Sequence, residues 1–525
     1  MSNEPSPVPK LSECEPKPSK NRLLKWLRRI MVVGMVLSLL GMARVWLAFR
    51  EPFPDYKAEL TILPEHQPSG LLRVGFAREK INPDITNTNR PVWMAGFSQN
   101  RAATAIHDDL WAVGIVLDDG KTRMGLVALD AIGFFNDDVI RVRKKLSPTS
   151  KINYAVVCST HNHSTPDLMG LWGPHPLRSG VDPSYQSQVI NTAARVLDNA
   201  AASLESTHFS LHEIELSPEG LLSDTRPPTV FDANLRFIHF QDPQTGRTQG
   251  SIIGWANHPE TVWSKNTEIT ADFPGYLRDA LERGITQSNK RIIEGIGGIH
   301  VFVNGAVGGL MTTHPSVVVK DPFEVIEYSK PTHEKTRALG YSLAKPVLER
   351  LRTTNAPTVP KASLGIVSRS ISIPVSNPGF KLAPILGILK RGQQPFNHIR
   401  TEVGLITLGD CSFVCIPGEI YPELINGGVE HPAGADFQVL KKEIPPIRAL
   451  LPGSVRFVLG LANDEIGYII PKSQWDEKPP HTYKPDKKPY GEVNSVGPEA
   501  APIIHESIAE IARTLSLDSK EKAHQ

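Results

Sequence analysis

The sequence predicts an α/β fold in which mixed β-sheets are flanked by helices. Short apolar runs, typical of buried strands, alternate along the chain with longer amphipathic segments, typical of helices that pack on a sheet. Strands are expected over residues 111–117, 125–129, 154–158, 252–256, 299–303, 412–416 and 455–460. Helices are expected over residues 185–204, 274–284, 333–352 and 498–515. No internal repeat interrupts this alternation, so we expect one large domain over residues 71–525.

The composition is that of an ordinary globular protein. Of 525 residues, 21% are charged and 40% are hydrophobic, and the formal net charge is +2. Residues 1–29 hold seven Lys or Arg against three Asp or Glu, so the remainder has a net charge near −2. A nearly neutral body argues against nucleic acid as a partner. Four cysteines are too few for a disulfide scaffold.

The N-terminal segment predicts a membrane anchor. Residues 1–29 are rich in Pro, Ser, Glu and Lys and are expected to form a disordered cytoplasmic tail. Residues 30–49 are an apolar run, interrupted only by Arg44, which is long enough to cross a bilayer. The basic residues before it place the N-terminus in the cytoplasm and the large domain outside. The alternative is a cleaved signal peptide and a secreted protein. Residues 50–70, with four prolines, are expected to be a linker.

Polar residues follow six of the predicted strands at the point where each strand ends. The first pair is His161 and His163, which in extended geometry point to the same side. His258 follows a second strand, and Glu419 follows a third. Histidines with one carboxylate are the ligand set of catalytic zinc, which keeps a position open for water. We therefore expect zinc on His161, His258 and Glu419, with His163 as acid and base.

Several motifs resemble the neutral/alkaline non-lysosomal ceramidase family, in the order that the family has them. The resemblance covers residues 71–500 and begins at Val74-Gly75-Phe76-Ala77-Arg78. The other motifs are Thr160-His161-Asn162-His163-Ser164, Thr225-Arg226-Pro227-Pro228, Asn257-His258-Pro259, Pro417-Gly418-Glu419, Asn463-Asp464 with Gly467-Tyr468, and Tyr490-Gly491-Glu492.

The resemblance implies a role for each matched residue. One zinc ion per chain is bound by His161, His258, Glu419 and Tyr468, and His163 is the acid and base. Arg226 and Tyr490 lie in the active site, where we expect them to stabilise the developing oxyanion. The implied reaction is hydrolysis of a ceramide-like amide to a fatty acid and a sphingoid base, by a zinc-activated water.

Two departures from the family pattern bear on substrate and architecture. The family loop carries an active-site serine where this chain has Gly309, so a serine-acyl mechanism is excluded and ceramide specificity becomes open. Ceramidases also carry a C-terminal immunoglobulin-like domain of about 100 residues, and too few residues follow Tyr490-Gly491-Glu492 for one. The alternatives are therefore a zinc hydrolase of another amide or ester, and a catalytically inactive, membrane-anchored binding protein.

One further segment is unusual. Residues 381–391 hold an apolar cluster between Lys381 and the pair Lys390 and Arg391. It is expected to belong to the core, or to form a lid or a membrane-touching segment beside the site that meets an acyl chain.

Overall fold

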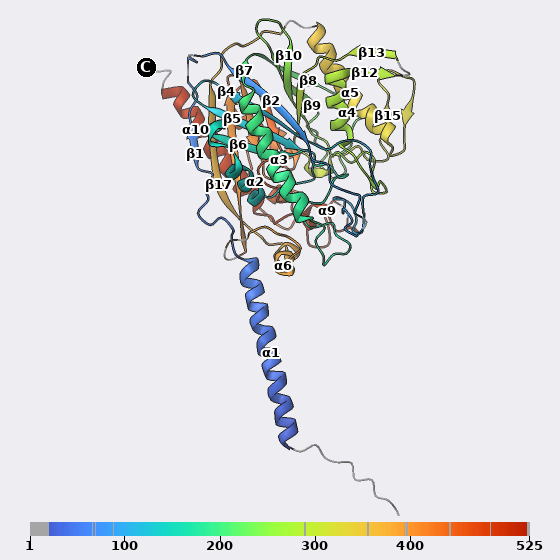
Figure 1. Cartoon of the computed structure of the whole chain (residues 1–525), viewed down its shortest axis with the longest axis vertical. Coiled ribbons are helices and arrows are strands. Elements are labelled where there is room, and N and C mark those ends of the chain that lie inside the picture. Colours follow the sequence, from blue (N-terminus) through green and yellow to red (C-terminus); the bar gives the residue numbers. More distant parts are fainter. Residues whose placement is uncertain are drawn as a thin grey trace, which may run out of the picture. The chain divides into compact units, whose positions relative to one another are not determined.

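The computed structural model describes residues 20–521 except 66, 69, 88, 288–289, 354–355, 393, 395–396, 440–442 and 484 (Figure 1). The chain divides into two units, Met1–Ala48 and Phe49–Gln525. The predicted tail falls partly outside the described residues. The predicted linker does not stay separate, because β1 (Leu60–Ile62) pairs with a strand of the large unit.

The first unit contains one apolar helix, α1 (Lys20–Ala48). It begins ten residues before the predicted apolar run at residue 30. Its segment Leu24–Ala48 has a mean hydropathy of 2.1 and is long and apolar enough to cross a membrane, a test that a signal sequence also passes. The helix is therefore the one candidate membrane span among the described residues.

Three sheets form the framework of the large unit. The first has the strand order β6-β5-β4-β2-β7, with bounds β2 Arg73–Lys80, β4 Trp111–Asp118, β5 Arg123–Leu129, β6 Tyr154–Ser159 and β7 Glu205–Ser206. The second has the order β14-β10-β9-β8, with bounds β8 His208–Glu215, β9 Asn234–Gln241, β10 Thr248–Trp255 and β14 Ile299–Asn304. The third has the order β1-β17-β18-β19-β21, with bounds β17 Leu364–Pro374, β18 His398–Leu408, β19 Cys411–Cys415 and β21 Val455–Leu459.

Each sheet mixes parallel and antiparallel pairs. The pairs β5·β6, β10·β14 and β19·β21 are parallel, and the remaining neighbours are antiparallel. Short two-stranded pairs complete the framework: β3 (Ala105–Ile106) with β11 (Glu268–Ile269), β12 (Gly284–Gln287) with β13 (Lys290–Glu294), β15 (Val319–Lys320) with β16 (Glu327–Tyr328), and β20 (Glu419–Ile420) with β22 (Tyr468–Ile469). The predicted mixed-sheet fold is confirmed.

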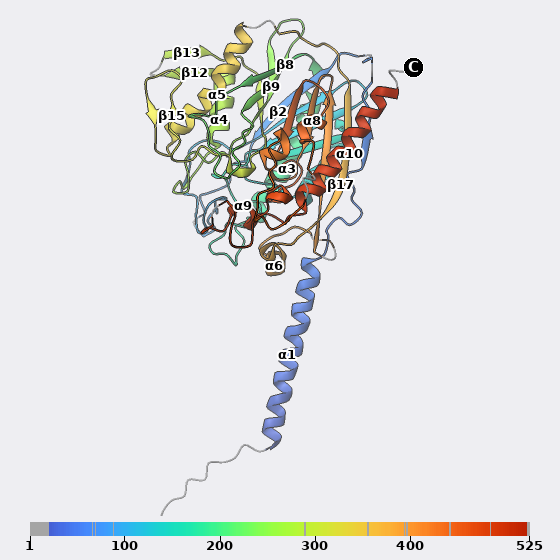
Figure 2. The same ribbon diagram turned by 180° about the vertical axis from the view of Figure 1, so that it is seen from behind.

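The three sheets share one core and carry helices on their outer faces. Val113, Phe240 and Phe413, one from each sheet, belong to the same buried cluster. Helices α2 (Asn136–Lys145) and α3 (Pro183–Ala202) cover the first sheet, α4 (Asp272–Arg283) and α5 (His333–Thr353) the second, and α10 (Ala500–Glu521) the third. Figure 2 shows α10 lying along β17. Shorter helices are α6 (Pro378–Leu386), α7 (Pro422–Asn426), α8 (Ile447–Leu450) and α9 (Tyr490–Val493).

The close approach of helix and sheet explains one glycine. A Cβ built on Gly75 of β2 would lie 1.9 Å from the carbonyl oxygen of Ala200 in α3. No side chain fits there, so glycine is required for the helix to pack on the strand.

Candidate metal centre

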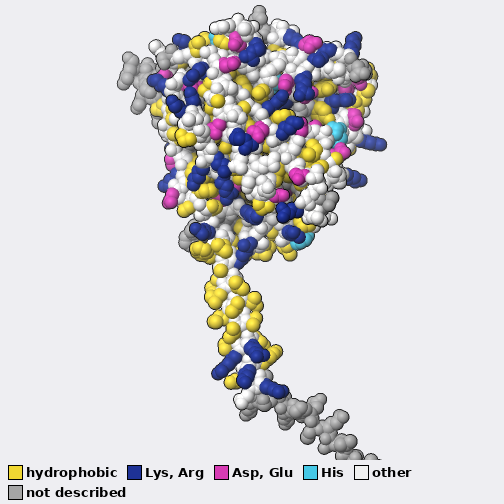
Figure 3. Space-filling model, viewed as in Figure 1, with side chains coloured by type: hydrophobic (Ala, Val, Ile, Leu, Met, Phe, Trp, Pro, Cys, Tyr) yellow, Lys and Arg dark blue, Asp and Glu magenta, His cyan; other side chains and the backbone are white. Residues whose placement is uncertain are grey.

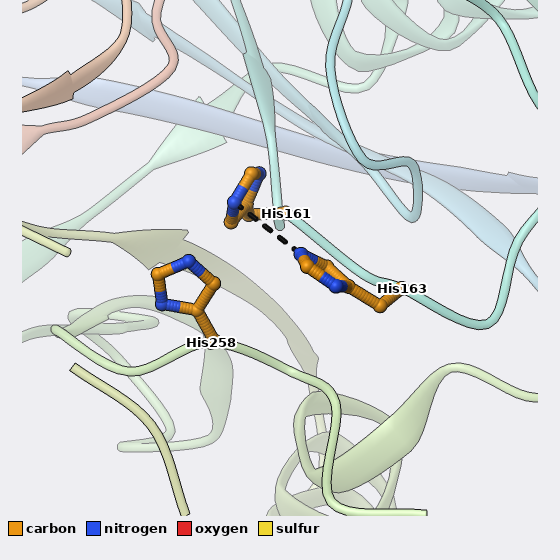
Figure 4. A group of neighbouring side chains, drawn as sticks. All are labelled: His161, His163 and His258. Atoms are coloured by element: carbon orange, nitrogen blue, oxygen red, sulfur yellow. Dashed lines mark hydrogen bonds between the residues drawn. The ribbon is translucent and has the colours of Figure 1, made fainter. Parts of the chain in front are cut away.

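The chain segments that follow three strands bring their polar side chains to one place. His161 and His163 follow β6, His258 follows β10, and Glu419 follows β19. Figure 4 shows the three imidazoles facing one another from two loops. Asn304 at the end of β14 fixes these loops, because its Nδ2 donates to the carbonyl oxygens of Thr160 and Asn257, both at 2.9 Å.

His161 does not have the extended geometry that the sequence predicts. Strand β6 ends at Ser159, and His161 has a φ of +67°. The left-handed region costs a non-glycine residue about 1–3 kcal/mol, and such strain persists where the surroundings hold it. The two imidazoles nevertheless converge, with 3.5 Å between their Nε2 atoms. The prediction of a shared target was right, and the local conformation behind it was wrong.

The donor atoms of His161, His258 and Glu419 are arranged as metal ligands. Oε2 of Glu419 lies 3.2 Å from Nε2 of His161 and 3.1 Å from Nε2 of His258. On the far side of each ring, Nδ1 lies 2.7 Å from a carbonyl oxygen, that of Ile132 for His161 and that of Met311 for His258. A carbonyl only accepts, so each Nδ1 carries a proton.

This arrangement fits a cation. Two Nε2 lone pairs and a carboxylate oxygen face one another, and three acceptors attract only a positive charge or an added proton between them. Nδ1–H groups held by carbonyls are the usual orientation of metal-binding histidines. Burial raises the pKa of the Glu419 carboxyl, but the two histidines outweigh burial and lower it overall. Burial disfavours the protonated His258, yet Glu419 and Glu260 raise its pKa. The residues present therefore fit zinc.

His163 is oriented by a carboxylate that sequence reasoning did not assign. Oε2 of Glu260 lies 3.0 Å from Nδ1 of His163, and Oε1 of Glu260 accepts from the Thr312 hydroxyl at 2.6 Å. Burial lowers the pKa of His163 to about 4, and Glu260 offsets this only in part. The ring is thus a neutral base near neutral pH. Glu260 lies two residues after His258, and only the fold reveals that it faces the other histidine loop.

Tyr468 and Tyr490 lie beside the group formed by His161, His258 and Glu419. The parallel pair β20·β22 sets Glu419 opposite Tyr468. Burial raises the pKa of the Tyr468 hydroxyl, and the Glu419 charge raises it further. The Tyr490 ring is 5.9 Å from that of Tyr468, centroid to centroid, and 54% of Tyr490 is exposed. Both tyrosines are therefore close to the expected metal ligands.

Arg226 lies in the same region but is engaged elsewhere. Its guanidinium makes a two-pronged ion pair with Glu492, at 2.7 and 2.9 Å. It also donates to the Tyr421 hydroxyl at 2.7 Å and to the Gln474 carbonyl at 2.9 Å. These bonds use all four hydrogens on Nη1 and Nη2. Arg226 thus ties Tyr421 to Glu492 through its Nη groups, while its buried Nε has no hydrogen-bond partner among the described residues.

Two cavities meet at the cluster. An apolar one of about 90 Å³ is lined by His161, Glu419 and a wall of apolar side chains that includes Phe135, Met169, Trp172, Phe380 and Leu389. A wider one of about 570 Å³ includes charged and polar side chains in its lining, among them His258, Glu260 and Arg226. His163, Tyr468 and Tyr490 line both. The cluster therefore lies between an apolar cavity and a wider one that also carries charged groups.

Gly309 has a backbone reason to be glycine. Its φ is +71°, and a Cβ there would lie 3.3 Å from Oδ1 of Asp224. A serine at this position would adopt the left-handed conformation against a carboxylate. The loop shape thus favours glycine at this position.

The described residues hold a second histidine–carboxylate group, His107, Glu268 and His333. It lies at β3, β11 and the start of α5, away from both cavities. The two rings are stacked with centroids 3.5 Å apart and an interplanar angle of 11°. The group is partly exposed and provides an internal contrast to the buried cluster.

Comparison with known proteins shows a fold relationship without a detectable sequence relative. No family model matches the chain, and no curated protein matches it. The crystal structure of neutral ceramidase from Pseudomonas aeruginosa matches with a TM-score of 0.63 at 14% identity, over 86% of this chain and 75% of that chain. A ceramidase complexed with C2 matches with a TM-score of 0.61 at 15% identity, over 86% and 76%. This chain therefore has the fold of neutral ceramidase.

Proposed function

We propose that this protein is a zinc-dependent hydrolase that cleaves a lipid amide of the ceramide type. The observation that carries the proposal is the convergence of His161, His258 and Glu419, with His163 held beside them, where an apolar cavity meets a wider one whose lining includes charged side chains. An amide that joins an acyl chain to a polar amine has the same two-sided character. The fold shared with neutral ceramidase supports this substrate class.

One zinc ion per chain is assigned to His161, His258 and Glu419, with Tyr468 as a fourth contact. Zinc in such a site lowers the pKa of water toward neutrality and polarises a carbonyl. The protein's contribution is to fix the donors. Glu419 is buried between the two rings, and each ring is locked from behind by a backbone carbonyl.

His163 is assigned the proton transfers. Its Nε2 lies beside His161, while Glu260 holds its Nδ1. A neutral imidazole in this position accepts a proton from water as the water attacks the carbonyl carbon. The same proton then passes to the amide nitrogen as the carbon–nitrogen bond breaks, so fatty acid and free amine leave. Glu260 stabilises the imidazolium that forms in between.

Tyr490 and Arg226 are assigned different roles. The Tyr490 side chain is half exposed where both cavities open, so its hydroxyl is the assigned donor to the developing oxyanion. Arg226 is assigned as a positioning residue, because its ion pair with Glu492 and its hydrogen bond to Tyr421 hold these two side chains in place.

The proposed layout is a cytoplasmic N-terminal tail, a single membrane-spanning helix and one catalytic domain outside the cytoplasm. The apolar helix α1 and the basic residues before the apolar run support it. Cleavage of this segment as a signal peptide is the competing layout, and the mass of the mature protein distinguishes the two.

The test is release of fatty acid from N-acylsphingosine in detergent micelles by the full chain, followed by mass spectrometry. We expect turnover by the wild type, none by Glu419→Gln, and wild-type turnover by Glu268→Gln, the matched change in the second histidine group. Turnover that survives Glu419→Gln would refute the assignment of the site.

A second candidate is a hydrolase of another amide or of an ester with the same site. Gly309 favours it, because the serine that the ceramidase pattern carries is missing here. A substrate panel separates the two: esters or short amides cleaved faster than ceramides would support the second candidate. Zinc binding without turnover of any of them would indicate a binding protein.

A further inference from the structure

Helix α6 presents an apolar face to solvent beside the apolar cavity. Leu382 and Leu386 lie four residues apart, hence on one face, and are 52% and 45% exposed. The opposite side is buried: Ala383 packs with Ile388 and Leu389, which follow the helix, in a cluster that includes Phe135. Phe380 and Leu389 also line the apolar cavity. The helix therefore stands between the cavity and the exterior.

The ends of α6 are firmly fixed, so its exposed face is a permanent feature. The Asn377 side chain accepts hydrogen bonds from the backbone N–H groups of Gly379 and Phe380, and Gly387 ends the helix with a φ of +76°. Nδ2 of Asn377 also donates to the carbonyl oxygens of Val493 and Ser495, at 2.8 and 2.9 Å. These bonds tie α6 to the segment of α9 that carries Tyr490.

The charges around the apolar face are basic. Lys381 and Lys390 flank the two leucines, and the segment Pro378–Arg391 contains no Asp or Glu. Figure 3 shows yellow and dark blue side chains together at the end of the large unit that carries α6. Apolar residues bordered by lysines are the pattern of a helix that lies in the interface of an anionic membrane.

Chain connectivity identifies the membrane as the occupant. The apolar span ends at Ala48, and the next fixed residues of the large unit are Glu51, whose carboxylate pairs with Arg400, and Pro52. Pro52 lies against Gly392, because a Cβ built on Gly392 would be 2.3 Å from its Cδ. Gly392 follows α6 by six residues. Three residues reach at most about 11 Å, so a spanning α1 holds this edge of the large unit at the bilayer.

We propose that the outer face of α6, formed by Leu382 and Leu386 and flanked by Lys381 and Lys390, docks on the bilayer and admits lipid substrate to the apolar cavity. The docking depends on the exposed face, its charge and the attachment of the chain. Substrate admission rests on the function proposed above. A water-soluble amide of the same chemistry would bypass α6.

Docking is tested without any catalysis. The full chain, with Cys14→Ser, is reconstituted in phosphatidylcholine vesicles that contain phosphatidylglycerol, and Leu386→Cys is labelled with an environment-sensitive fluorophore. The remaining cysteines, Cys158, Cys411 and Cys415, are buried. The matched control is Val325→Cys, fully exposed in the turn between β15 and β16. Lipids brominated on their chains are expected to quench the probe at 386 several times more than the probe at 325. Equal quenching would overturn the docking.

Substrate admission is tested by kinetics. With Leu382→Asn and Leu386→Asn combined, hydrolysis of a long-chain amide embedded in vesicles is expected to fall about fivefold to tenfold, because the apolar contact with the bilayer is lost. Hydrolysis of a soluble short-chain amide is expected to stay at the wild-type rate. An equal fall for both substrates would overturn admission. If the wild type cleaves neither amide, the proposed function fails, while the quenching result still decides the docking.

Discussion

The two histidine–carboxylate groups of this protein have the same residue types but different geometry. In the buried cluster, Nδ1 of His161 and of His258 is held by a backbone carbonyl, and both Nε2 atoms face Glu419. In the partly exposed group, the rings of His107 and His333 are stacked 3.5 Å apart. Stacked rings hold their nitrogen lone pairs in nearly parallel planes, so we expect this group to bind a metal less well than the buried cluster.

We expect this difference in orientation, more than proximity, to decide which group binds a metal. In the partly exposed group, Glu268 lies 3.0 Å from Nε2 of His333, as close as Glu419 lies to its histidines. The His107 Nε2 is bonded to the Tyr276 hydroxyl at 3.0 Å, and the group lines neither of the two cavities at the buried cluster. Side chains engage Nε2 of both His107 and His333, whereas the buried cluster leaves three acceptors facing one another.

The largest expected effect is the loss of a metal ligand. Glu419→Gln removes the charge that holds the cation, so kcat/KM should fall by at least about 1,000-fold, because metal polarisation is worth several kcal/mol. Glu268→Gln, its counterpart, should change kcat/KM by less than about twofold. Initial rates on the best substrate of the panel measure both. Comparable losses of kcat/KM in the two variants would contradict the proposed difference between the two histidine groups.

The proton carrier comes next. His163→Ala should lower kcat by about 100-fold to 10,000-fold, the usual contribution of a general acid–base residue. The zinc content should remain, since His163 is not an assigned ligand. His107→Ala should leave both quantities at their wild-type values. Loss of zinc in His163→Ala would instead make His163 a ligand and leave the proton transfers without a carrier.

The pH profile sharpens the role of Glu260. Burial lowers the pKa of His163 to about 4, so the base form is present above that pH and the acid limb of kcat/KM should lie there. Glu260 raises this pKa, so Glu260→Gln should move the limb to lower pH. The plateau should also fall about 10-fold to 100-fold, because the ring loses its orienting partner. A limb that stays in place or moves to higher pH would contradict the pairing.

Breaking the Arg226–Glu492 pair is expected to have the smallest effect on catalysis but a large effect on the free energy of unfolding. Glu492→Gln leaves a buried guanidinium without its counter-charge, which should lower the free energy of unfolding by about 3–5 kcal/mol. Glu79→Gln breaks the exposed pair with Arg195 and should cost less than about 1 kcal/mol. Urea unfolding of the full chain in detergent compares them. Equal costs would mean that Arg226 is not a positioning residue.

The sequence predicted seven of the framework strands, because strand burial is a local property, but it did not predict β8, β9, β17 and β18. Strands β4, β5, β6, β14, β19 and β21 were placed to within two residues, and β10 begins four residues earlier than expected. The linker was misplaced in part, because three of its residues form the edge strand β1, which pairs with β17 more than 300 residues later in the sequence.

The sequence pointed to residues of the candidate site, but it did not predict which side chains contact one another. Strand-end positions in the sequence singled out His161, His258 and Glu419, and the fold brings them together from strands β6, β10 and β19 of three different sheets. The pairing of Glu260 with His163 and of Arg226 with Glu492 depends on segments 97 and 266 residues apart, which periodicity does not relate. The left-handed His161 is likewise a product of tertiary packing.

The most direct test of the account is the metal content of the purified full chain, measured by elemental analysis beside His258→Ala and His333→Ala. The account predicts about one zinc per chain in the wild type and in His333→Ala, and none in His258→Ala. Zinc that is absent from the wild type after gentle purification, or retained in His258→Ala, would contradict the assignment of the buried cluster as the metal centre.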